Sequence, residues 1–357
     1  MRLTSIAAGI VVLAASTYPL ARPMASHASA APSESALQES GSRGPLINPS
    51  RPSQEPETAQ QKEPPQSSAP LQVQTTVVNV FTTVRDRHNG IVSDLTKNDF
   101  KVFEDGAEQK ISYFTKEVDL PLSLALLMDT SGSMQDILNA EKEAASNFVE
   151  EVMHKKDEAA VLSFDTDVNL LADFSEDPGV LQHAIRRAEI NVDATGVGGT
   201  GGTVPSRGGG TNLYDAVYLA AHDELSSEAG RKAIILLTDA EDTGSKLSEN
   251  DAIESAQRAD AVLHFILIID PSASEGYGPG VASKMAHETG GRVISVRNDE
   301  GLRKAFDTIA EELRSQYVIG YYPANTKHDG TFRKIRVDVD RADLKILARK
   351  GYYAPSR

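Results

Sequence analysis

Four nearly continuous apolar segments recur through the middle of the chain, and each of them ends in an aspartate. They are LSLALLMD, AAVLSFD, AIILLTD and AVLHFILIID, at residues 122–129, 159–165, 233–239 and 261–270. Strands of this composition are buried on both faces, as they are in parallel sheets. Helical patterns separate the segments. The alternation predicts an α/β domain with a doubly wound, mostly parallel sheet.

Apolar residues at helical spacing predict where the helices of this domain lie. One helix follows the first strand, and others are expected at about 213–225, 248–259 and 302–313. The apolar stripe of the first helix comprises Met134, Ile137, Leu138, Ala145, Phe148, Val149 and Val152.

Segments with the patterns of β-strands flank this domain on both sides. Before it, residues 73–84 alternate, and turns are predicted at Asn89-Gly90 and Asp105-Gly106. After it come YVIGYY, KIRVDVD and LKILARKGYY. Neither flank has many strands, and an unpaired strand edge is a liability. We therefore expect both flanks to form one small β-sandwich, with the α/β domain inserted between them; two independent β appendages are the alternative.

The N-terminal end has the layout of a secretory signal peptide. Arg2 precedes an apolar run from Ile6 to Ala15, and the small residues Ala28, Ser29 and Ala30 follow. Residues 1–30 are therefore expected to be a signal peptide, which predicts a secreted or periplasmic protein. An uncleaved membrane anchor is the alternative, although a membrane span needs about 20 apolar residues. No second run reaches that length, so we expect no stable membrane span in the mature form.

The remaining boundaries follow from composition and pattern. Residues 31–72 are rich in Pro, Ser, Gln and Glu, and they predict a disordered linker. Residues 73–118 form the N-terminal β segment, 119–314 the α/β domain and 315–357 the C-terminal β segment.

Charge and cysteine content exclude several functions. The formal net charge of −15 argues against a nucleic-acid partner, because a phosphate backbone is repelled by such a surface. The chain has no cysteine, which excludes disulfides and thiolate catalysis. Without cysteines or an HExxH motif, a zinc site is not expected. Neither GxSxG nor GxxxxGK[ST] occurs, so no serine hydrolase or phosphate-binding loop is predicted.

Oxygen-bearing side chains follow the predicted strands where a ligand site is expected. In open α/β sheets, ligands bind outside the carboxyl ends of the strands. Asp129, Ser131, Ser133, Thr211 and Asp239 supply two carboxylates and three hydroxyls there. Such a set suits a hard cation: Mg²⁺, or alternatively Mn²⁺ or Ca²⁺. In the competing interpretation, Asp129 caps a helix and the serines are ordinary turn formers.

The motifs around these residues resemble a known family. DTSGS, followed by Thr in GGTNLYDA and Asp in LLTDAEDTG, is similar to the metal-ion-dependent adhesion site of von Willebrand factor type A domains. The resemblance covers about residues 122–313. Together with the signal peptide, LTKNDFKVFEDG and YVIGYYP, the chain looks like the exported von Willebrand type A-related proteins that are abundant in acidobacteria.

The resemblance implies a role for each ligand. Ser131 and Ser133 would bind the metal directly, Thr211 would bind it in the high-affinity state, and Asp129 and Asp239 would act directly or through water. One coordination position stays open, and family members fill it with an Asp or Glu of a partner protein. Movement of the last helix, here about 302–313, is coupled to the metal in relatives.

Three other aspartates and one loop receive other interpretations. Asp165 and Asp270 are interpreted as solvated strand ends, and Asp242 as a residue at the surface or behind the ligands. The glycine-rich stretch 194–210 is expected to be a mobile loop that enters the metal site just before Thr211 and shapes partner access.

The leading functional hypothesis is a non-enzymatic binding or adhesion module that captures an acidic residue of a protein ligand through the bound cation. A structural or assembly protein that uses its β flanks is one alternative. A metal-dependent hydrolase is another, although metal-assisted hydrolysis usually requires a general base or a second metal nearby. The sequence indicates no catalytic residue, and it does not predict the oligomeric state.

Overall fold

The structure is a computed structural model, and it describes residues 77–116, 120–190, 210–269 and 278–356. The predicted signal peptide, the predicted linker, Asp270 and residues 194–209 of the glycine-rich stretch lie outside the described residues.

A six-stranded sheet in the order β10-β9-β8-β5-β6-β7 forms the centre of the α/β domain. All neighbouring strands are parallel except β6 and β7, which are antiparallel. The predicted mostly parallel sheet is therefore confirmed. Its strands are β5 (Leu122–Asp129), β6 (Glu158–Phe164), β7 (Val168–Ser175), β8 (Arg231–Thr238), β9 (Ala261–Ile268) and β10 (Val293–Val296).

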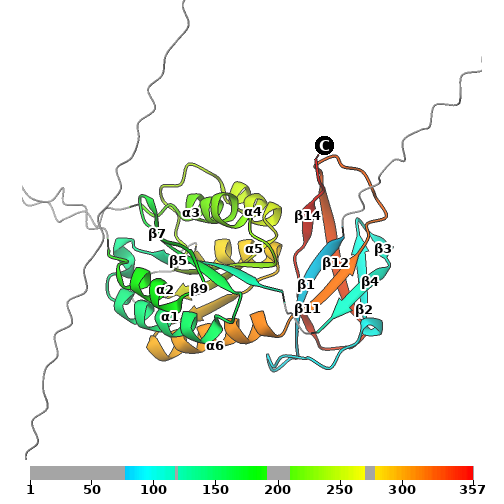
Figure 1. The fold of residues 1–357 in the computed structure, drawn as a ribbon, viewed down its shortest axis with the longest axis horizontal. Helices are drawn as coiled ribbons and strands as arrows, with labels where there is room; N and C mark the ends of the chain where they lie inside the picture. Colours follow the sequence, from blue (N-terminus) through cyan, green and yellow to red (C-terminus); the bar gives the residue numbers. More distant parts are fainter. Residues whose placement is uncertain (1–76, 117–119, 191–209, 270–277, 357) are drawn as a thin grey trace, which may run out of the picture. The chain divides into compact units, whose positions relative to one another are not determined.

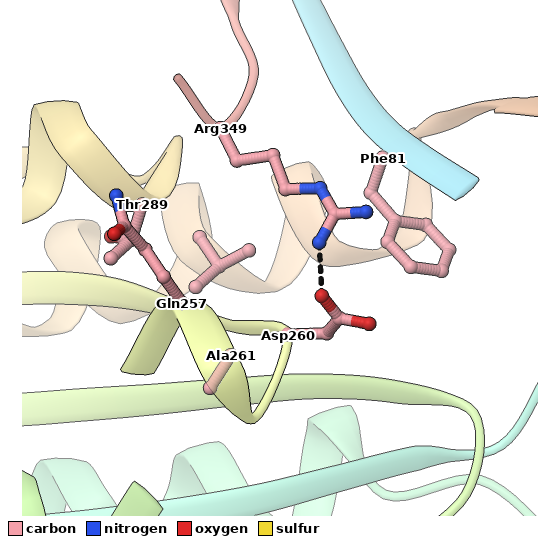
Figure 2. Close-up of a pocket in the computed structure, with 7 residues that line it drawn as sticks. Phe81, Gln257, Asp260, Ala261, Thr289 and Arg349 are labelled. Atoms are coloured by element: carbon pink, nitrogen blue, oxygen red, sulfur yellow. Dashed lines mark hydrogen bonds and ion pairs between the residues drawn. The ribbon is translucent and has the colours of Figure 1, made fainter. Parts of the chain in front are cut away.

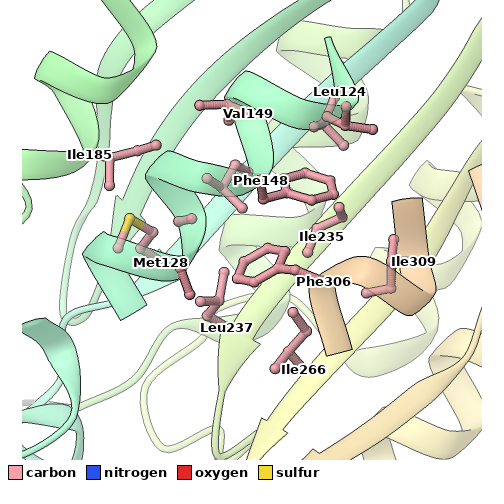
Figure 3. Close-up of a cluster of buried hydrophobic side chains, with 14 of the residues drawn as sticks. Leu124, Met128, Phe148, Val149, Ile185, Ile235, Leu237, Ile266, Phe306 and Ile309 are labelled. Carbon is pink, nitrogen blue, oxygen red and sulfur yellow. The ribbon is translucent and has the colours of Figure 1, made fainter. Parts of the chain in front are cut away.

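Helices cover both faces of this sheet (Figure 1). On one face lie α1 (Leu138–Val152), α2 (Pro178–Arg186) and α6 (Asp299–Arg314). On the other lie α3 (Leu213–Leu219), its π-helical continuation η4 (Ala220–Leu225), α4 (Glu249–Arg258) and α5 (Gly278–Thr289). Alternate residues of β5 pack into the two cores, so both faces of the strand are buried. In one of them, Phe148 of α1 and Phe306 of α6 have ring centroids 4.7 Å apart (Figure 3).

The first helix begins later than its apolar stripe predicts. Met134 lies in a separate 3-10 turn, η2 (Gly132–Met134), and Ile137 occupies the cap position before α1. Ser131, which precedes the turn, has an extended backbone with φ −66° and ψ 161°. Met134 is still buried, because the short turn carries it against the domain before the helix starts.

The two β flanks form one sandwich, and the alternative of two separate appendages is wrong. One sheet has the order β13-β1-β11-β4 and the other β14-β12-β2-β3, so each combines strands from both ends of the chain. The hairpin between β2 and β3 turns at Asp105 and Gly106, both with positive φ. The strands are β1 (Val78–Arg85), β2 (Phe100–Glu104), β3 (Ala107–Gln109), β4 (Ile111–Thr115), β11 (Tyr317–Tyr321), β12 (Phe332–Val339), β13 (Lys345–Leu347) and β14 (Gly351–Tyr353), and a short 3-10 turn, η1 (Lys97–Asp99), precedes β2.

A buried cluster of charges joins β1 to the last helix of the α/β domain. Arg85 Nε donates to Glu312 Oε1 at 2.7 Å, and Arg292 Nε lies 3.0 Å from the same oxygen. The side chains of Arg85 and Glu312 are only 3% and 1% exposed. A separate ion pair joins Arg349 to Asp260 (Figure 2).

Within the described ranges, no helix combines the length and apolar character that a membrane crossing requires.

Candidate metal centre

The strand order places a topological switch point between β5 and β8. From β5 the chain moves to β6 and β7 on one side, and later strands β8, β9 and β10 lie on the other side. Ligands of open α/β sheets bind outside the carboxyl ends of the strands at such a point. Asp129 is the last residue of β5, and Asp239 directly follows β8. Two predicted ligands therefore flank the position where the topology favours a site.

Asp129 and the two serines form a compact group at the end of β5. The backbone N–H of Ser131 donates to Asp129 Oδ1 at 2.9 Å, and the hydroxyl oxygens of Ser131 and Ser133 are 3.0 Å apart. Asp129 and Ser131 are buried, whereas Ser133 is exposed. The group is therefore held from the domain side and open toward solvent on the other side.

Burial dominates the electrostatics of Asp129. It raises the pKa of the carboxyl to about 7, and the charge of Asp239 acts in the same direction. Hydrogen bonds from Ser131 and Thr238 favour the carboxylate but do not offset the burial. A bound cation would stabilise the charged form, so this carboxyl suits a cation site.

Thr238 is part of this group, although the sequence analysis does not single it out. Its hydroxyl donates to Asp129 Oδ2 at 2.6 Å. Met128 is paired with Leu237 in the parallel register of β5 and β8, so Asp129 and Thr238 are neighbours across the sheet. The sequence contains a signal for this role in the motif LLTD, where a threonine directly precedes Asp239 at the end of an apolar strand.

Thr211 is placed at this edge by its backbone. Its N–H donates to Thr243 Oγ1 at 2.8 Å, in the loop after β8. The next residue, Asn212, donates its N–H to the carbonyl oxygen of Asp165 at 2.8 Å, just after β6. Asp165 Oδ2 in turn accepts a 2.8 Å bond from Thr130 Oγ1, between Asp129 and Ser131. These hydrogen bonds thus connect the segment at the end of β5, the segment before α3 and the loop after β8. The three segments carry the five predicted ligands.

Asp239 is held by a tight turn. Its Oδ1 accepts from the N–H of Glu241 at 3.0 Å, and Ala240 has φ 59°, which is unusual for a residue other than glycine. Gly278, at the start of α5, packs against this turn so closely that a Cβ there would collide with the carbonyl oxygen of Asp239. Backbone strain of this kind gathers at functional sites.

Two of the interpretations made for other aspartates can be compared with the structure. Asp165 is not a solvated strand end: it is 4% exposed and accepts hydrogen bonds from Thr130 and Thr166. The interpretation is wrong because the loop after β5 folds over the end of β6. Asp242 is half-buried and accepts from Ser245 at 2.5 Å, so it helps to fix the loop beside α3.

The donor set fits a hard cation bound largely by hydroxyls. No group of three His, Asp or Glu side chains that could hold a metal occurs in the part of the chain that the structure describes. Carboxylates alone therefore do not make the site, and the hydroxyls of Ser131, Ser133 and Thr211 would complete it. Oxygen ligands of this type are those that Mg²⁺ prefers.

The family of this domain follows from its sequence. Residues 124–241 match the family model of the von Willebrand factor type A domain. The match includes all five predicted ligands. The central domain is a von Willebrand factor type A (VWA) domain.

Solved structures similar to this chain include three bacterial proteins. The conserved hypothetical protein BatB from Bacteroides thetaiotaomicron is 16% identical, with 54% of this chain and 100% of that chain covered and a TM-score of 0.41. The vWF domain of the type V pili tip protein Mfa5 from Porphyromonas gingivalis is 15% identical, with 54% and 95% covered and a TM-score of 0.40. A von Willebrand factor type A structure from Catenulispora acidiphila is 15% identical, with 73% and 75% covered and a TM-score of 0.44. No curated protein matches the sequence.

Glu141, on α1 of the VWA domain, is acted on by the charges of this site, although its sequence pattern does not single it out. It is fully buried, and neither of its carboxylate oxygens has a hydrogen-bond partner among the described residues. Burial raises the pKa of Glu141 well above its ordinary value, and the charges of Asp129 and Asp239 raise it further. The signal is its position three residues after Leu138, inside the apolar stripe of the helix.

Two hollows elsewhere do not include the predicted ligands. A cavity of about 10 Å³ lies beside Phe81, Asp260 and Arg349 (Figure 2). A groove of about 580 Å³ is lined by residues of β2, β12 and α5, among them Phe103 and Lys334. The candidate metal centre of the VWA domain thus lies at an open edge of the sheet and does not coincide with either hollow.

Proposed function

We propose that this chain is an exported, non-enzymatic binding module whose VWA domain captures an Asp or Glu side chain of a protein partner through a divalent cation. Mg²⁺ is the expected ion, and Mn²⁺ or Ca²⁺ would use the same ligands. The supporting observation is the 3.0 Å approach of the Ser131 and Ser133 hydroxyls at the switch point, beside Asp129.

The chain's own residues would hold the ion from one side. Ser131, Ser133 and Thr211 offer neutral hydroxyls, and Asp129 and Asp239 offer carboxylates. A divalent cation held there supplies positive charge to which a further carboxylate can bind. Ser133 is exposed and Asp239 only half-buried, so this side is accessible to a partner.

The charge of the whole chain acts against an acidic partner at long range. With a formal net charge of −15, the chain repels other acidic proteins, and salt screens this repulsion. We therefore expect the association rate with an acidic partner to rise as salt is added, while the short-range contact at the ion fixes the specificity.

Immobilised peptides provide a direct test. Each peptide with a single Asp or Glu is paired with its Asn or Gln counterpart, and the full chain is applied in Mg²⁺ or in EDTA. We expect retention only on acidic peptides and only with Mg²⁺. The Ser131→Ala variant should lose retention on the acidic peptides. The control variant, Ser93→Ala, changes an exposed serine before β2 and should keep that retention.

Equal retention on acidic and amide peptides, or retention that survives EDTA, would contradict the proposal. Partner capture that survives EDTA would instead favour assembly through the β flanks. Hydrolysis of phosphate, ester or peptide substrates that EDTA abolishes would favour the metal-dependent hydrolase.

A further inference from the structure

Glu141 occupies a position where the packing calls for an apolar side chain. It lies in the first turn of α1, and the other residues on its face of the helix belong to the core between α1 and the sheet. They are Leu138, Ala144, Ala145, Phe148, Val149 and Val152. A glutamate in such a stripe is costly unless a charge or a donor compensates it.

The described residues offer Glu141 no such compensation. Its Oε1 and Oε2 are both buried and without a hydrogen-bond partner among them. The charges that act on it most strongly are those of Asp129 and Asp239, and both are negative. Glu141 is thus a buried carboxyl whose charged neighbours are the two carboxyl ligands at the ends of β5 and β8, and a cation held by those ligands would favour its charged form.

On the basis of the proposed function, we propose that Glu141 is a positioning residue of the metal centre, whose buried and unpartnered carboxylate is stabilised by the divalent ion and in turn helps to hold that ion. It is not a third direct carboxylate ligand, because these carboxylates do not form a group that could bind a metal together. Its action is through charge, which is little screened in a buried site.

A role that depends on the charge of Glu141 can be distinguished from a role in packing alone. A carboxyl that only fills space can be replaced by glutamine, which has nearly the same shape, without effect on cation binding. A carboxyl that acts through its charge cannot, since glutamine keeps the volume and removes the charge. Residues behind metal ligands commonly change metal affinity by about 10- to 100-fold when replaced.

The test measures Mn²⁺ binding to the full chain by electron paramagnetic resonance, together with the melting temperature in EDTA. We expect Glu141→Gln to weaken Mn²⁺ binding by about tenfold or more. In EDTA its melting temperature should be equal to or higher than that of the wild type, because the uncompensated carboxyl is gone. Glu143→Gln removes the same charge from an exposed position of α1 and should change Mn²⁺ affinity less than about twofold.

Glu141→Asp keeps the charge with a shorter side chain, so it tests the proposal even if the glutamine variant folds poorly. It should bind Mn²⁺ more tightly than Glu141→Gln. Wild-type affinity in Glu141→Gln, or equal losses in the Asp and Gln variants, would overturn the role of Glu141. If the wild type itself binds no Mn²⁺, the proposed function fails, and this inference fails with it.

Discussion

Thr238 Oγ1 donates a 2.6 Å hydrogen bond to Asp129 Oδ2, and this bond joins the ends of β8 and β5. Both side chains are fully buried. The second carboxylate oxygen of Asp129 accepts from the N–H of Ser131. The orientation of Asp129 is therefore fixed from two neighbouring segments before any ligand arrives.

Removing the Thr238 hydroxyl should destabilise the domain. In Thr238→Val, a buried carboxyl group loses a donor, and we expect the free energy of unfolding to fall by about 1–3 kcal/mol. Thr238→Ser keeps the hydroxyl, so its free energy of unfolding should fall by less. Urea denaturation measures both values, and a valine variant as stable as the serine variant would show that the bond does not matter.

Gly278 should be required for the turn that carries Asp239. In Gly278→Ala, the new Cβ collides with the Asp239 carbonyl, so we expect a loss of about 1–3 kcal/mol in unfolding free energy and weaker Mn²⁺ binding. Gly280 provides the matched control in the same helix, because a Cβ there has open space. Gly280→Ala should stabilise α5 by up to about 1 kcal/mol. Equal effects of the two variants would contradict the close approach.

Glu312 should be essential for the attachment of β1 to α6. Glu312→Gln leaves the guanidinium groups of Arg85 and Arg292 without their shared carboxylate, and breaking a buried pair in this way costs about 3–5 kcal/mol. Glu311 is next in sequence, but its side chain is 59% exposed, so Glu311→Gln should change stability by less than about 1 kcal/mol. Thermal unfolding measures the stability of both variants. Equal losses in Glu312→Gln and Glu311→Gln would contradict the buried network.

His264 should make the protein less stable in acid. Burial, with a further contribution from Arg292, lowers its pKa to about 3, whereas an unfolded histidine titrates near 6.5. Between these values the unfolded state binds a proton that the folded state excludes, so stability is lost as pH falls below about 6.5. Asp129 contributes a slope of opposite sign in this range, because its raised pKa of about 7 makes the folded state take up a proton as pH falls. The test therefore compares two slopes: from pH 7.5 to 5 the wild type should lose more stability, or gain less, than His264→Phe. Parallel slopes would mean that His264 does not cause the loss.

The sequence predicts the larger part of the fold because the decisive patterns are strong. The four apolar segments all form central strands, and the alternation of Val78, Val80, Thr82 and Val84 is borne out by their burial in the sandwich. Strands β7 and β10 and helices α2 and α5 are missed. Strand β7 is an edge strand, half-exposed along its length, so it has no continuous apolar run to reveal it.

The surroundings of the candidate site are harder to predict than its ligands. Thr238 belongs to an apolar strand and Glu141 to an apolar helix stripe, so neither stands out in a motif. Their relation to Asp129 depends on the parallel register of β5 with β8 and on the packing of α1. The interpretation of Asp165 as a solvated strand end is wrong for the same reason, because only the folded loop after β5 brings Thr130 to it.

The most direct test of the account is a Mn²⁺ titration of the full chain, followed by electron paramagnetic resonance with Mg²⁺ as competitor. We predict that the wild type and Ser93→Ala bind a single Mn²⁺ ion that Mg²⁺ displaces, and that the Ser131→Ala/Ser133→Ala double variant, still folded by circular dichroism, loses this binding. Undiminished binding in the folded double variant, or none in the wild type, would contradict the account.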